Sequence, residues 1–115
     1  MKSSIILGMP LELISDRLYG LIDKGDNGIA TDAMKKMKFI EEHMFRCEEH
    51  WDGITIVRKV FGVVVDSWIE FNGALDIKPD TLAYIERTFR ADVKSRLGLD
   101  LNDKLYVIGM TYEEK

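Results

Sequence analysis

The apolar residues between positions 52 and 73 are spaced like those on one side of a long helix. A strand is the alternative, since Val and Ile favour sheets. However, adjacent apolar residues break strict alternation, and the run exceeds the usual ~3–10 residues of a strand. Asp52 can cap the first turn and Gly73 can end the helix in a left-handed conformation, so we expect a helix over residues 53–72. Its main apolar face would consist of Ile54, Val57, Phe61, Val64, Val65, Trp68 and Phe71.

Three further segments have the same amphipathic spacing, and we expect them to be helices as well. Proline suits the first turn of a helix, and glycine suits the position after the last turn. The first and the last of these segments have both residues at their ends. The expected helices cover residues 10–24, 31–51 and 79–97.

The terminal segments have a composition typical of strands. Residues 4–8 and 105–112 are rich in Ile, Val and Tyr, and they could pair as a small two-stranded sheet. The chain of 115 residues has no internal repeat and no Pro-rich linker, which indicates a single domain over residues 1–115. The predicted fold is therefore a mainly α, single-domain bundle of about four helices, with an α+β fold as the alternative.

The charge and the cysteine content indicate which partners and which cell compartment to expect. The net charge of −4 opposes general attraction to nucleic acid, whose binding depends on clustered Lys and Arg. Cys47 is the single cysteine, so an internal disulfide is excluded and a reducing, cytoplasmic location is expected. Charged residues such as Arg58 and Asp66 argue against a membrane span in the segment 53–72.

The predicted helix 31–51 has one cluster of possible metal ligands, His43, Cys47 and His50. On a helix, their spacing places all three within an arc of about 60°. Imidazole and thiolate are ligands that zinc prefers, so a zinc site is one hypothesis. The alternative is structural, because Cys47 also falls on the apolar stripe and free cysteine is usually buried.

The segment from Asp23 to Met34 has the length of a calcium loop between two helices. Asp23 and Asn27 occupy ligand positions, but Gly25 and Met34 stand where the third and twelfth positions need oxygen ligands. A Gly-Asp-Asn-Gly turn is the simpler interpretation, so we do not expect calcium binding.

The predicted helix 79–97 presents a basic stripe of Arg87, Arg90 and Lys94. Such a stripe could contact nucleic acid or an acidic partner. A solvated face is the alternative, because Glu86 and Arg90 are spaced for an ion pair within the helix.

No Gly-rich phosphate loop, nucleophile elbow or C-x-x-C motif occurs in the chain, so we do not expect an enzyme. The main hypothesis is a small cytoplasmic regulator, inhibitor or immunity-type factor that binds another protein. We also expect a homodimer, because the segment 53–72 has more apolar circumference than a small monomer covers. Its contact would involve Gly62, Asp66 and Ile69. A metal protein using His43, Cys47 and His50 and a nucleic-acid-binding regulator are the alternatives.

Overall fold

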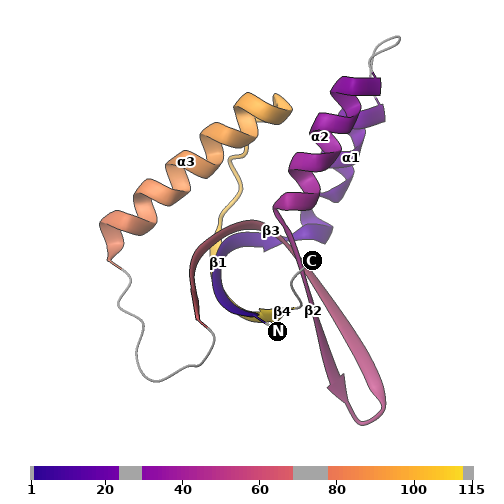
Figure 1. Ribbon diagram of the computed structural model, residues 1–115, viewed down its shortest axis with the longest axis vertical. Helices are drawn as coiled ribbons and strands as arrows, with labels where there is room; N and C mark the ends of the chain where they lie inside the picture. The colour runs from indigo at the N-terminus through magenta and orange to yellow at the C-terminus, as the bar shows by residue number, and fades with distance from the viewer. Residues whose placement is uncertain (1, 24–29, 69–77, 113–115) are drawn as a thin grey trace.

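The computed structural model describes residues 2–23, 30–68 and 78–112, and it has an α+β fold (Figure 1). The prediction of a mainly α bundle of about four helices is therefore wrong, and the α+β alternative is correct. In chain order the elements are β1 (Lys2–Pro10), the short 3₁₀ helix η1 (Leu11–Leu13), α1 (Ser15–Asp23), α2 (Ala30–Glu42), β2 (Met44–Trp51), β3 (Ile54–Trp68), α3 (Pro79–Leu97) and β4 (Tyr106–Tyr112).

The strands form one antiparallel sheet in the order β2-β3-β1-β4. Helices α1 and α2 lie in the connection from β1 to β2, and α3 lies in the connection from β3 to β4. The strand order is that of the split β-α-β, or ferredoxin-like, arrangement, with two α-helices instead of one in the first connection. The predicted pairing of the terminal segments is present, because β1 pairs with β4 and Lys2 lies opposite Tyr112.

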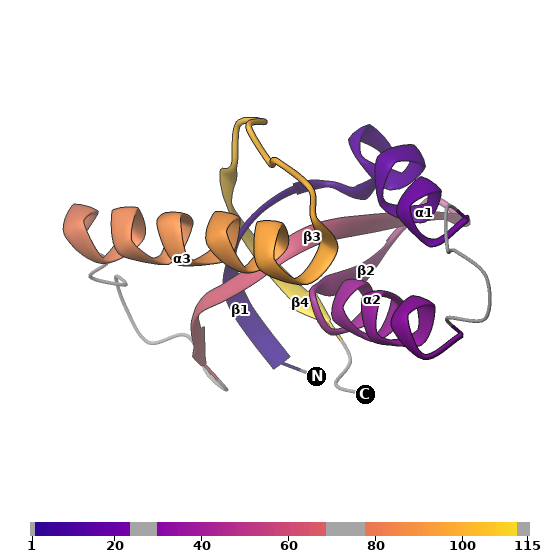
Figure 2. The same ribbon diagram turned by 90° about the horizontal axis from the view of Figure 1, so that it is seen from above.

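The helices cover one side of the sheet, and the main core lies between them (Figures 1 and 2). Phe61 of β3 is fully buried there, and its ring centroid lies 5.4 Å from that of Phe89 on α3. Apolar residues of β1, of α2 and of the segment from Ile14 into α1 are also part of the core. They include Leu7, Met9, Ile14, Leu18, Phe39 and Ile40.

The segment predicted as the helix 53–72 is the strand β3 in its described part. Its centre is buried on both faces, because the helices cover Phe61 while Val60, on the opposite side, is also buried. A strand buried on both faces has consecutive apolar residues and loses the alternation that identifies a half-buried strand. Trp68 pairs with Ser3 in the sheet, and residues 69–72 lie outside the described part.

The segment predicted as the helix 31–51 divides into α2 and β2. Its apolar spacing continues from one element into the next by coincidence, so the periodicity gave no sign of the break at His43. The correct signal was Asp52-Gly53, where the helical interpretation placed the cap and the first residue of the helix 53–72. Both residues have positive φ, 45° and 78°, as the type I′ turn of a two-residue hairpin requires.

The helix predicted over residues 79–97 is correct at both ends, as α3. Pro79 occupies its first turn, and Gly98 has a left-handed conformation with its N–H bonded to the Lys94 carbonyl at 2.9 Å. The predicted helix 10–24 is only partly correct. Strand β1 continues to Pro10, and η1 precedes α1.

The sheet is strongly curved, and a pair of glycines lies where β1 and β3 approach most closely. Gly8 and Gly62 are directly opposite each other in the antiparallel ladder. A Cβ atom on Gly8 would lie 2.5 Å from the Phe61 carbonyl oxygen, and one on Gly62 would lie 2.7 Å from the Gly8 Cα. Only glycine fits at both positions, which lets the two backbones bend together.

An ion pair fastens α1 to the segment before β4. Arg17 donates two hydrogen bonds to the Asp103 carboxylate, at 2.9 and 2.8 Å. These bonds hold the pKa of Asp103 below its usual value. Asp103→Asn should therefore lower the melting temperature slightly at neutral pH. The corresponding loss in the free energy of unfolding should be within the ~0–1 kcal/mol typical of exposed ion pairs.

The pH dependence of this stabilisation follows from the direction of the pKa shift. A carboxyl group with a lowered folded-state pKa stabilises the fold above its unfolded pKa of about 3.9 and loses that effect as the pH falls. The melting temperatures of the wild type and Asp103→Asn should therefore converge below about pH 4. An equal difference at pH 7 and at pH 3 would contradict this account.

Candidate functional site

Strands β2 and β3 form a two-stranded ribbon, residues 44–59, that projects from the body of the protein (Figure 1). Residues paired across the ribbon share a side, and the sides differ in chemistry. The side toward the helices is mostly polar, with Arg46, Glu48, His50, Thr55 and Lys59, and it has one valine, Val57. The opposite side, which we call the ribbon face, carries Cys47, Glu49, Ile54, Ile56 and Arg58.

The apolar residues of the ribbon face are exposed. The relative exposure is 64% for Ile54 and 42% for Ile56. Alternation of apolar and polar residues is typical of a strand that buries one of its sides. In the ribbon only the stretch Ile54-Thr55-Ile56 alternates in this way, and its two isoleucines face the surroundings. Covering an isoleucine fully would contribute about 1.5–3 kcal/mol.

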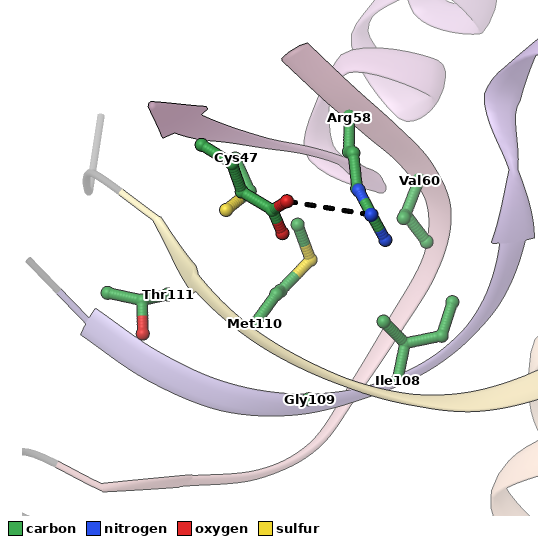
Figure 3. A pocket seen from close by; sticks show the side chains of 8 residues that line it. Cys47, Arg58, Val60, Ile108, Gly109, Met110 and Thr111 are labelled. Carbon is green, nitrogen blue, oxygen red and sulfur yellow. Dashed lines mark ion pairs between the residues drawn. The ribbon is translucent and has the colours of Figure 1, made fainter. Parts of the chain in front are cut away.

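A hollow of about 350 Å³ continues the ribbon face toward β4 (Figure 3). It lies where the sheet curls so far that Cα atoms of its two edge strands, β2 and β4, come within 8 Å of each other. Its lining consists of Cys47, Glu49, Arg58, Val60, Ile108, Gly109, Met110 and Thr111. Most of this lining is apolar, so the hollow extends the uncovered surface instead of adding a polar site.

One ion pair lies on the ribbon face, in the lining of the hollow (Figure 3). Arg58 Nη2 is 3.5 Å from Glu49 Oε2, and the side chains are 66% and 37% exposed. At this exposure the pair contributes little to stability. The pair matters for the charge of the surface, because the opposite charges of Glu49 and Arg58 leave the ribbon face with no net charge.

The proposed zinc ligands do not share one side of an element. His43 follows α2, and its ring packs on Phe39, with Nδ1 2.9 Å from the Phe39 carbonyl oxygen. Cys47 lies on the ribbon face, and His50 lies on the other side of the ribbon, 3.1 Å from Thr55 Oγ1. The helical projection behind the zinc hypothesis is therefore wrong. Among the described residues, no group of three or more His, Cys, Asp or Glu side chains has the geometry of a metal site.

The basic stripe is on α3, but two of its members have structural partners. Arg90 bonds to Glu86 at 2.9 Å and to the Leu101 carbonyl oxygen at 2.7 Å. Lys94 lies 3.1 Å from Asp100, while Arg87 is exposed. Binding of nucleic acid or of an acidic partner by this stripe stays a prediction.

Two other predicted sites fall partly outside the described residues. The possible calcium loop has its centre in residues 24–29, which the structure does not describe. Of the residues predicted for self-association, Gly62 packs against Gly8 inside the sheet. The side chain of Asp66 and the whole of Ile69 are not described.

No protein-family model matches the chain, and neither the curated proteins nor the solved structures contain a significant match to it. Within the described ranges, no helix is long and apolar enough to cross a membrane. The ribbon face was missed in the sequence because Ile54 and Ile56 were assigned to a helix. The turn at Asp52-Gly53 together with the spacing of these two isoleucines could have revealed it.

Proposed function

We propose that this protein acts by binding another protein through the ribbon face, as a cytoplasmic regulator, inhibitor or immunity-type factor. The observation that carries the proposal is the exposure of Ile54 and Ile56, two neighbouring isoleucines on one side of the ribbon. Contiguous exposed apolar surface is characteristic of interaction sites on proteins of this size. The lone Cys47 agrees with a reducing compartment.

The position of the ribbon also supports this proposal. A projecting hairpin is accessible to a large partner from several directions, whereas a small molecule favours an enclosed cavity. The hollow lies between β2 and β4, and it would extend the contact between the ribbon face and the partner. Ile108 and Met110 would then contact apolar groups of the partner.

Affinity capture from the native cells tests the proposal with a matched pair of variants. The double variant Ile54→Asp/Ile56→Asp should lose the partner protein, because buried carboxylates at the contact are costly. The control is Met34→Asp, which changes an apolar residue of α2 that is 70% exposed, close to the 64% of Ile54.

The control should retain the partner, and both variants should keep the wild-type melting temperature within a few degrees, since all three positions are exposed. Capture of the same protein by the wild type and the double variant would contradict the assignment of the ribbon face. Failure of the wild type to retain any protein would contradict the function itself.

A further inference from the structure

We propose that a second copy of this chain covers the ribbon face when no other partner is bound, with the two copies related by a twofold axis. This inference rests on the proposed function, because it identifies one occupant of the same surface. The two occupants would use the same isoleucines. Self-pairing and binding of another protein would therefore exclude each other.

The first argument is the surface area of the single chain. Its accessible surface is 8121 Å² for a mass of 13.2 kDa. A compact monomer of this mass exposes about 6,400 Å², so the chain exposes about 1,700 Å² more than the trend. A stable protein interface buries about 800 Å² on each partner. The excess belongs to the whole chain, and it is larger than the area that one partner buries in such an interface.

The dimensions of the chain also indicate a shape that is less compact than that of a typical monomer of this length. The radius of gyration is 15.6 Å, and the principal extents are 51, 41 and 23 Å. A compact domain of this length has a radius of about 13 Å. The projecting ribbon contributes to this extended shape (Figure 1).

The second argument is charge. A twofold contact places the same surface against itself, so any net charge on that surface would be doubled and repulsive. Glu49 and Arg58 are the charged members of the ribbon face, and they have opposite signs. In a twofold pair, each Arg58 can approach the Glu49 of the other copy, which makes the face complementary to itself.

The third argument separates the ribbon face from the other exposed apolar residues. Met34 on α2 and Tyr84 on α3 are as exposed as Ile54, but each belongs to a different helix, and Val57, 42% exposed, pairs with Glu48 on the opposite side of the ribbon. Single exposed apolar residues are normal on protein surfaces and need no partner. On the ribbon face, Ile54 and Ile56 occur together, and beyond Glu49 and Arg58 the face continues into the hollow.

Sedimentation equilibrium of the purified full chain tests the inference. The wild type should have twice the chain mass of 13.2 kDa at high concentration and dissociate on dilution. Ile54→Asp/Ile56→Asp should be monomeric throughout, and Met34→Asp should remain a dimer. Circular dichroism and melting curves establish that each variant is folded.

A charge-exchange experiment then tests whether the partner is a second copy in this arrangement. Arg58→Glu leaves two acidic groups on the ribbon face, and Glu49→Arg leaves two basic groups. Each variant alone should dissociate more readily than the wild type, by roughly tenfold or more in the dissociation constant. Mixing the two variants should restore the dimer, because the two faces are then complementary.

The outcomes separate this inference from the proposed function. A wild type that stays monomeric at every concentration overturns the inference, while affinity capture still decides whether another protein binds. A dimer that persists in Ile54→Asp/Ile56→Asp, or variants that fail to pair when mixed, also overturns it. A dimer that meets all these expectations but captures no other protein supports the inference and contradicts the proposed function.

Discussion

Phe61→Ala should lower the free energy of unfolding by about 3–5 kcal/mol, the usual cost of removing a large aromatic side chain from a packed core. Phe61 is fully buried in the centre of β3. Its ring lies 5.4 Å from that of Phe89 and 6.5 Å from that of His43, measured between centroids, so it joins the sheet to α3 and to the end of α2. Urea unfolding followed by circular dichroism measures the loss.

Tyr84→Ala is the matched control for this substitution. Tyr84 is an aromatic residue of α3 with 63% exposure, so its removal should change the free energy of unfolding by less than about 0.5 kcal/mol. A cost below about 1 kcal/mol for Phe61→Ala would mean that the core between β3 and α3 is not packed as described.

Gly62→Ala should destabilise the fold by about 3 kcal/mol, the upper end of the range of about 1–3 kcal/mol for overpacking. The added methyl group would meet the Leu7 carbonyl oxygen and would lie 2.7 Å from the Gly8 Cα. Both are backbone atoms, so they cannot move aside as a flexible side chain would. Thermal unfolding gives the measurement, and Gly8→Ala should show a similar loss.

Gly109→Ala provides a control in the same sheet. Gly109 is in β4, and a Cβ atom there would have no heavy atom within 4 Å. Alanine should be tolerated at this position or stabilise the fold slightly, because it reduces the freedom of the unfolded chain. Equal destabilisation by Gly62→Ala and Gly109→Ala would show that close approach of β1 and β3 is not the cause.

The helix α3 was predictable because its signals are local. Pro79 and Gly98 mark its ends, and Phe89, Val93 and Leu97 repeat every four residues on its buried side. Such a helix packs one face on the sheet and exposes the other, which is the situation that helical periodicity describes. The helix predicted from these local signals is therefore the helix that the structure contains.

The strand β3 was not predictable from periodicity, because its environment changes along its length. The part from Ile54 to Lys59 belongs to the projecting ribbon, while the part around Val60 and Phe61 is buried on both sides. No single period fits the apolar residues of both parts, and their spacing over the whole segment resembled that of a helix. Val60 lines the hollow together with Ile108 and Met110 of β4, so its burial involves residues that lie far from it in the sequence.

The candidate site was hidden for the same reason. Cys47 was singled out as a metal ligand, whereas Ile54 and Ile56 were counted among the residues of a helix. Once Asp52-Gly53 is read as a hairpin turn, Cys47 pairs with Arg58 and Glu49 pairs with Ile56. The chemistry of the face follows from that register, which the sequence does not state directly.

The position of β1 in the sheet has a consequence for synthesis of the chain. Strand β1 is made first, but both of its neighbours, β3 and β4, are made later, and β4 ends at Tyr112. During translation, the apolar residues Ile6, Leu7 and Met9 therefore stay unpaired until the strands that pair with them, β3 and β4, have left the ribosome. Pairings over such sequence distances also slow refolding. Nascent chains interrupted before β4 should be the form that depends most on chaperones.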